Sequence, residues 1–253
     1  MGVLIETNRH VARITLDRPP LNVLGIELLK ELDSILERLT ADTSTNVVVV
    51  QGGGGRAFSA GVDVRDHTRE RVPEMLRVVH GVMHKFLALP QITIALVRGA
   101  CLGGGLELAS CCDLILASTD SVFGTPEINV GCYPPAALVG FPALLGYHRA
   151  AELILTGQRI SAEQAAAIGL INRAVPRQEL DEALEALLAE LGGKSAAVLR
   201  ISLKGLREMR LRTFAADLAR AEEIYLGELL KTEDVEEGVR AFIDKRKPDW
   251  KHR

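Results

Sequence analysis

The N-terminal segment of the chain changes from a two-residue period of apolar positions to a helical one. Residues 3–16 predict two short strands joined by a turn at Asn8-Arg9, and the second strand alternates apolar and polar positions. After two prolines, apolar residues recur every three or four positions, which predicts an amphipathic helix over residues 26–39.

Two apolar runs further along each predict a strand that ends in a glycine-rich turn. Four valines over 47–50 are followed by Gly52, and the run 92–97 leads into the turn 99–105. Continuous apolar runs of this length are typical of strands buried on both faces. The pattern also predicts two helices and a further strand, over 73–88, 106–111 and 113–117. This alternation of strands and helices is typical of the α/β class.

The C-terminal third of the chain is predicted to be mostly helical. Ser161 and Gln164 have the spacing of a capping box, in a helix that ends at Gly169. A boundary at Gly192-Gly193 divides the chain into a core of residues 1–192 and a helical region of residues 193–253. Apolar stripes along the later helices are expected to pack on the core or on another subunit, and the sequence leaves both open.

Composition and charge exclude several classes of partner. The 253 residues are 47% hydrophobic and 25% charged, which suits one large domain or a domain with an appendage. The net charge is only −3 and the basic residues are scattered, so we expect neither a nucleic acid partner nor a polybasic membrane patch. The N-terminus lacks the pattern of a signal peptide, and no apolar segment approaches the ~20 residues that span a bilayer. A cytoplasmic protein is therefore expected.

The four cysteines do not predict a disulfide or a metal site. Their positions show no metal-ligand spacing, and in a reducing compartment they are expected to be small buried hydrophobic residues. They are Cys101, Cys111, Cys112 and Cys132.

Both glycine-rich turns are candidates for binding an anion. Two backbone N–H groups that converge on one point can stabilise the developing charge of a thioester enolate, and small residues let a substrate approach the chain closely. The first turn covers 57–63, and the second covers 102–107 at the start of a helix, where free N–H groups favour an anion. The alternative is that glycine supplies a positive φ in two ordinary turns.

Two glutamates stand among apolar residues close to these turns. Glu107 lies one turn into an apolar helix, and Glu127 follows Thr125-Pro126 in a segment with Phe123 and Ile128. A carboxylate in such surroundings costs free energy unless it is solvated, paired or used in chemistry. A pair of carboxyls that flank a double bond can take a proton from water and deliver one to carbon. The alternative is that both face solvent.

At this point the chain resembles a known family. The stretches 57–63, 99–113 and 123–131 are similar to the signature segments of enoyl-CoA hydratases in the crotonase superfamily, in the same order and at the usual separations. The start, ITLDRPPLNVL, and the end, GVRAFIDKRKP, are similar as well, so the resemblance covers nearly the whole chain. It implies an α/β fold with a spiral of ββα turns and a helical C-terminal region that drives trimer formation, commonly doubled to a hexamer.

The resemblance also implies the chemistry and the residues that perform it. The expected activity is that of a hydro-lyase on an acyl-CoA thioester, with no separate cofactor because coenzyme A is part of the substrate, and with no metal. The oxyanion hole is implied at the N–H groups of Val62 and Gly104. Glu107 is implied to activate water, and Glu127 to protonate the α-carbon. Because both glutamates are present, hydration is favoured over isomerisation.

Further residues are implied to bind the coenzyme A part of the substrate. They are Leu21, Ala60, Asp63 and Val64 near the first glycine turn, and Phe242 and Lys245 near the C-terminus.

The chain departs from the hydratase pattern after Glu127. Pro135 stands where the usual hydratase has a glycine whose N–H helps to hold the catalytic water, and proline has no N–H to donate. The hydroxyl of Tyr133 is a candidate replacement, with packing under a rigid turn as the alternative. The Tyr-Pro-Pro turn resembles that of cyclohexa-1,5-diene-1-carbonyl-CoA hydratases of aromatic compound degradation. A short-chain 2-enoyl-CoA hydratase of fatty acid metabolism is the direct competitor.

Other function classes are less well supported by the sequence. Residues 57–61 imitate the nucleophile elbow of a serine hydrolase, but only His148 and His252 follow as partners. His80 and His84 have metal-ligand spacing without a third ligand, and a solvated helix face is the expected role. An isomerase or other acyl-CoA enzyme of the same fold and a non-catalytic scaffold that binds coenzyme A or RNA remain alternatives.

Overall fold

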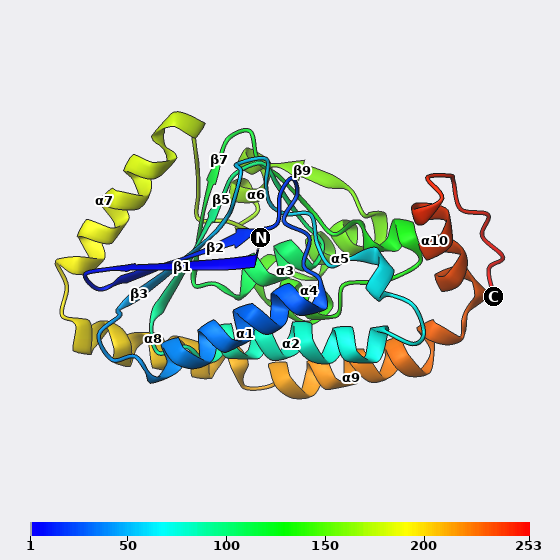
Figure 1. Ribbon diagram of the computed structural model, residues 1–253, viewed down its shortest axis with the longest axis horizontal. Helices are drawn as coiled ribbons and strands as arrows, with labels where there is room; N and C mark the ends of the chain where they lie inside the picture. The colour runs from blue at the N-terminus through cyan, green and yellow to red at the C-terminus, as the bar shows by residue number, and fades with distance from the viewer. Residues whose placement is uncertain (1) are drawn as a thin grey trace.

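The computed structural model describes residues 2–253 and contains two sheets flanked by helices (Figure 1). The larger sheet has the strand order β1 (Gly2–Asn8), β2 (Val11–Asp17), β3 (Val47–Gly52), β5 (Ile92–Val97), β7 (Leu114–Ser118) and β10 (Arg173–Val175). The smaller sheet has the order β4 (Ala57–Ser59), β6 (Ala100–Leu102), β8 (Val122–Gly124) and β9 (Arg159–Ser161). Pairing is parallel except between β1 and β2 and between β8 and β9.

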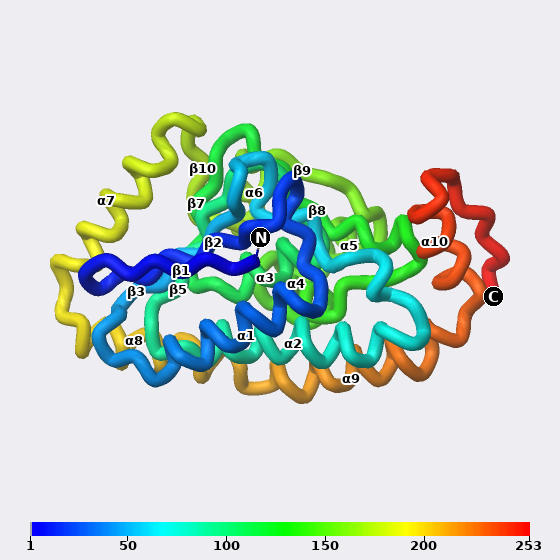
Figure 2. Tube along the Cα trace, in the orientation of Figure 1, coloured from blue at the N-terminus to red at the C-terminus, as the bar shows by residue number. Residues whose placement is uncertain are grey.

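Successive turns of the chain build both sheets at once. Each turn adds one strand to the larger sheet and then one to the smaller sheet: β3 and β4, then β5 and β6, then β7 and β8. The first two turns close with the helices α2 (Val72–Ala88) and α3 (Gly104–Cys111). This winding is the expected spiral of ββα turns, and the tube in Figure 2 follows it along the chain.

The remaining segments are helical. The α-helices are α1 (Ile26–Ala41), α4 (Pro135–Leu145), α5 (Tyr147–Thr156), α6 (Ala162–Ala167), α7 (Leu180–Gly192), α8 (Ala196–Leu211), α9 (Phe214–Gly227) and α10 (Glu233–Ile243). Short 3-10 segments are η1 (Val64–Asp66), η2 (Pro126–Val130), η3 (Arg177–Glu179) and η4 (Leu229–Lys231). The predicted capping box of α6 is confirmed, since Ser161 and Gln164 bond to each other's backbone N–H. None of the helices in residues 2–253 is long and apolar enough to cross a membrane.

Both faces of the larger sheet are covered, which explains the continuous apolar runs. Val48 and Val50 belong to the main core with α1 and α2, whereas Val47 and Val49 pack with Leu184 of α7. In Figure 1, α7 lies on one side of the sheet, and α1, α2 and α9 run together along the other. All four cysteines are buried, as expected for small hydrophobic residues.

The C-terminal helices differ in where their apolar stripes go. On α9, Leu218, Ala221 and Tyr225 are at most 3% exposed and pack back on the core of the same chain. The outer stripe of α8, in contrast, is between 61% and 72% exposed. It consists of Val198, Ile201, Leu206 and Met209. The boundary predicted near residue 192 falls at the end of α7.

Candidate active site

One pocket collects most of the residues that the sequence singled out. It lies between the two glycine turns, η2, α2, α9 and α10. Those residues are Leu21, Ala60, Val62, Val64, Gly104, Glu107, Glu127, Tyr133, Pro135 and Phe242. Of the predicted site residues, only Asp63 and Lys245 lie outside its lining.

The two glycine turns touch, which places two backbone N–H groups beside each other. A Cβ added at Gly61, whose φ is 105°, would lie 3.5 Å from the Gly104 nitrogen. A Cβ at Gly104 would lie 3.4 Å from the Val62 nitrogen. Within residues 2–253, neither the Val62 nor the Gly104 N–H donates a hydrogen bond. The helix α3 begins at Gly104, two residues earlier than predicted, so this N–H is one of its free N-terminal donors.

The first turn does not present a nucleophile. Ser59 is fully buried, and its Oγ accepts a hydrogen bond from the Gly61 N–H at 3.1 Å. This bond holds the turn in shape. The hydroxyl therefore has a local structural role, which argues against the serine hydrolase interpretation.

Glu107 is buried and held by the start of α4. Its side chain is 5% exposed, and Oε1 accepts a hydrogen bond from the Ala137 N–H at 2.8 Å. Burial raises the pKa of this carboxyl, while the nearby His80 and the N–H groups of Ala137 and Ala136 act in the opposite direction. The helix start thus favours the ionised form of a carboxyl that its surroundings would otherwise keep protonated.

Glu127 faces the second glycine turn from η2. A Cβ added at Gly103, whose φ is 53°, would lie 2.5 Å from Glu127 Oε1, so the carboxyl approaches a position that only glycine leaves open. Its Oε2 is shielded from solvent and has no hydrogen-bond partner among the described residues. Burial, with a contribution from the Glu107 charge, raises the pKa of Glu127 to about 8.

The structure assigns Tyr133 and Pro135 contacts that the sequence did not suggest. The Tyr133 hydroxyl donates to the Ala221 carbonyl oxygen of α9 at 2.7 Å, and its ring packs edge-on against Tyr225. Its only proton is therefore used in a structural bond, which contradicts the idea that this hydroxyl replaces the missing glycine N–H. Pro135 occupies the first turn of α4, where a missing N–H breaks no helical bond.

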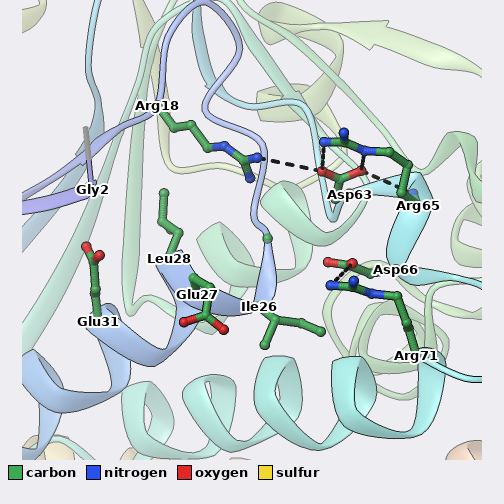
Figure 3. Close-up of a pocket in the computed structure, with 11 residues that line it drawn as sticks. Gly2, Arg18, Ile26, Glu27, Leu28, Glu31, Asp63, Arg65, Asp66 and Arg71 are labelled. Carbon is green, nitrogen blue, oxygen red and sulfur yellow. Dashed lines mark hydrogen bonds and ion pairs between the residues drawn. The ribbon is translucent and has the colours of Figure 1, made fainter.

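Asp63 lines a separate, charged cleft, in which its carboxylate lies between Arg18 and Arg65 (Figure 3). Its carboxylate accepts from Arg65 Nε at 2.9 Å and Nη2 at 2.6 Å, and Arg18 Nη2 lies 3.8 Å away. Hydrogen bonding to Arg65 lowers the pKa of Asp63. In this structure Asp63 orients two guanidinium groups and does not line the pocket itself.

At the C-terminal edge of the pocket, Arg246 takes the place predicted for Lys245. Lys245 is exposed and has a φ of 54°, just after α10 ends, whereas Arg246 lines the pocket and pairs with Glu237. The chain changes direction at the end of α10, which brings Arg246 to the pocket lining and leaves Lys245 on the surface beside it.

Sequence reasoning missed two buried polar residues in the pocket wall. His80 was expected on a solvated helix face, and this was wrong: it is 3% exposed, lines the pocket, and its Nδ1 bonds to Glu222 of α9. Tyr225 is 1% exposed and lines the same pocket. The helical spacing of His80 and His84 does not indicate that α9 covers His80.

Comparison with known proteins identifies the family of this chain. Residues 6–253 match the family model described as Enoyl-CoA hydratase/isomerase. The chain belongs to this family. A Bacillus subtilis (strain 168) protein named "Probable enoyl-CoA hydratase" is 34% identical over 256 residues, covering 99% of this chain and 98% of the relative. The cyclohexa-1,5-dienecarbonyl-CoA hydratase of Thauera aromatica is 30% identical over 253 residues, covering 100% and 97%.

Solved structures agree with the family assignment. The crystal structure of an enoyl-CoA hydratase/isomerase from Xanthobacter autotrophicus Py2 matches with a TM-score of 0.86 at 31% identity, covering 97% of each chain. The expected crotonase superfamily and its α/β fold are therefore confirmed, as is an enzyme of the hydro-lyase type. In this member of the enoyl-CoA hydratase/isomerase family, the two glycine turns and both glutamates line one pocket.

Proposed function

We propose that this enzyme adds water to the double bond of an α,β-unsaturated acyl-CoA thioester. One observation carries the proposal. The N–H groups of Val62 and Gly104, which donate no hydrogen bond within residues 2–253, and the carboxyls of Glu107 and Glu127 line a single pocket. This set provides both a site for the thioester oxygen and the acid and base that hydration requires.

The proposed mechanism uses each group once. The thioester oxygen accepts from the Val62 and Gly104 N–H groups, which stabilise the enolate charge as it develops. Glu107 takes one proton from water while the water oxygen bonds to the β-carbon, and Glu127 gives one proton to the α-carbon. The raised pKa of Glu127, about 8, suits a proton donor at neutral pH. The N–H groups at the start of α4 stabilise the ionised form of Glu107, which is the form that acts as a base.

We further propose that the coenzyme A part of the substrate lies along the mouth of the pocket and that no separate cofactor is needed. Leu21, Ala60 and Val64 line the side of the first glycine turn, and Phe242 lines the side of α10. Asp63 contributes by orienting Arg65 and Arg18, whose positive charges suit the phosphates. Lys245, exposed at the same end as Phe242, is proposed to add a further positive charge.

For the acyl group, we propose a cyclic dienoyl thioester such as cyclohexa-1,5-diene-1-carbonyl-CoA. Two features support it: the Tyr133-Pro134-Pro135 turn lines the pocket, and the Thauera aromatica relative carries that substrate in its name. A short-chain enoyl-CoA thioester is the second candidate, since other relatives include a short-chain-enoyl-CoA hydratase of Clostridium acetobutylicum, which is 31% identical.

The test is water addition followed by mass spectrometry with crotonyl-CoA and, separately, with the cyclic dienoyl thioester. Fast conversion of the cyclic substrate alone supports the aromatic-degradation role, and preference for crotonyl-CoA identifies a short-chain hydratase. Glu107→Gln and Glu127→Gln should each reduce turnover by about 10²-fold or more with thioester binding retained. Inertness toward both substrates would contradict hydration and favour isomerisation or a non-catalytic scaffold.

We also propose that the enzyme forms a homotrimer or a homohexamer and acts in the cytoplasm. The exposed stripe of α8, which contains Ile201 and Met209 at 72% and 70% exposure, is apolar surface suited to a subunit contact. Light scattering after size-exclusion chromatography measures the mass. A monomer at micromolar concentration would refute the assembly.

A further inference from the structure

His80 is a buried polar side chain in the pocket wall that the proposed mechanism does not use. It lies on the inner face of α2 with Met75, Leu76 and Val79, which line the same pocket. The ring is 3% exposed, and its Nε2 has no hydrogen-bond partner among residues 2–253. A buried polar atom without a partner costs free energy, so native structures rarely keep one without a ligand or water to satisfy it.

The other ring nitrogen of His80 is bound to a carboxylate. Nδ1 bonds to Glu222 Oε1, and this bond lowers the pKa of Glu222, so the carboxylate is ionised. An ionised carboxylate only accepts, so Nδ1 carries a proton that it donates to Glu222. This bond uses one side of the ring and leaves Nε2 in the pocket wall. Nε2 requires a hydrogen-bond partner of its own.

Further buried polar atoms lie in the same pocket. Among residues 2–253, Glu127 Oε2 is buried without a hydrogen-bond partner, and the buried Tyr225 hydroxyl, on the same face of α9 as Glu222, has only the weakly bonding Cys132 thiol beside it. The Tyr133 hydroxyl faces α9 but is already bonded to the Ala221 carbonyl. A purely aliphatic acyl chain would leave His80 Nε2 unsatisfied, whereas an oxygen function would satisfy it.

We propose that His80, oriented by Glu222, forms a hydrogen bond through Nε2 with a hydroxyl group in the acyl pocket, so that the site favours oxygenated acyl-CoA thioesters over plain aliphatic ones. This inference rests on the proposed acyl-CoA substrate. The hydroxyl has two possible sources, the oxygen that hydration adds at the β-carbon and a hydroxyl further along the acyl group. Both present the same hydroxyl group to Nε2, and the position of the hydroxyl on the ligand distinguishes them.

The experiment is calorimetric binding of three thioesters: butyryl-CoA, 3-hydroxybutyryl-CoA and 4-hydroxybutyryl-CoA. One of the hydroxylated thioesters should bind the wild-type protein about three- to tenfold more tightly than butyryl-CoA, the range of one net hydrogen bond. His80→Phe should remove this advantage and leave butyryl-CoA affinity within about twofold. An advantage for the 3-hydroxy compound identifies the added water as the source, and one for the 4-hydroxy compound identifies a distal hydroxyl.

His84→Phe is the matched control, because His84 lies one turn further along α2, is exposed, and packs on Phe214 outside the pocket. It should keep the hydroxyl advantage. If His80→Phe does not fold, Glu222→Ala tests the same point. It removes the bond that orients the His80 ring, so it should reduce the tighter binding of the hydroxylated thioester. Nitrogen NMR of the imidazole adds a direct measurement: the Nε2 resonance of His80 should shift when the hydroxylated thioester binds and stay unchanged with butyryl-CoA.

The outcomes separate this inference from the proposed function. Equal affinity for all three thioesters, or an advantage retained in His80→Phe, overturns the role of His80 even where crotonyl-CoA is hydrated normally. Failure to bind any thioester overturns both. Hydration of crotonyl-CoA, measured separately, depends on Glu107 and Glu127 and reports on the proposed function alone.

Discussion

Replacing Gly103 with alanine should damage both stability and turnover, because this residue combines two constraints. Its φ of 53° and ψ of −133° lie outside the regions that residues with a Cβ adopt comfortably. Holding a non-glycine residue there costs about 1–3 kcal/mol. For a chain of this size, that corresponds to a fall in the melting temperature of roughly 2–12 °C.

The second constraint concerns Glu127. The added Cβ would lie 2.5 Å from Oε1. Because non-bonded atoms need about 3.5 Å, the carboxyl has to retreat by about 1 Å. A displacement of about 1 Å at a reacting group can cost about 10²-fold in rate, so Gly103→Ala should lose turnover by about that factor beyond any loss of folded protein.

Gly205→Ala is the matched control for this substitution. Gly205 lies inside α8, and an added Cβ there would meet nothing within 4 Å. Alanine is favoured over glycine in a helix by about 1 kcal/mol, so this variant should be more stable and equally active. Thermal unfolding followed by circular dichroism and hydration of the preferred enoyl-CoA measure the two effects. A Gly103→Ala protein with wild-type melting and turnover would refute the argument that Glu127 depends on this glycine.

Three further predictions follow from other contacts. Because Glu127 must be protonated to donate and its pKa is raised to about 8, kcat should fall as the pH rises through about 8; a kcat unchanged up to pH 10 would contradict this role. Arg207→Met removes the guanidinium that contacts the partly buried Asp113 at 2.5 and 2.9 Å, and should cost about 3 kcal/mol in denaturant unfolding. A loss below about 1 kcal/mol would contradict this prediction. Tyr133→Phe removes only the bond to Ala221, so it should lower the free energy of unfolding by about 1 kcal/mol and preserve kcat. A large loss of kcat would show that this hydroxyl takes part in the reaction.

The elements that the sequence predicted well are those whose pattern is local. The valine run at 47–50 implied a strand buried on both faces, and the structure places alternate valines in two separate cores. The helix predicted over 26–39 is α1, which ends only two residues later. In these segments the spacing of apolar residues alone determines which faces are buried.

The candidate site was predictable only in part, because its wall is assembled from distant segments. Glu107 and Glu127 stood out as carboxyls in apolar surroundings near glycine turns, and the structure brings both to the pocket. His80 did not stand out, because its burial depends on Glu222 and Tyr225 of α9, far along the chain. A histidine on an amphipathic helix has the same local pattern whether solvent or another helix covers it.

Pro135 shows why the loss of one donor need not remove the site. The start of a helix presents several free N–H groups in nearly the same direction, and proline at the first position removes a single one. The next two, of Ala136 and Ala137, remain and act on Glu107, with the Ala137 N–H at 2.8 Å from Oε1. The helix start therefore stabilises the base itself instead of the water. In the proposed reaction, the water is then positioned by Glu107, Glu127 and the acyl group, which makes its place depend on the shape of the substrate more than on the backbone.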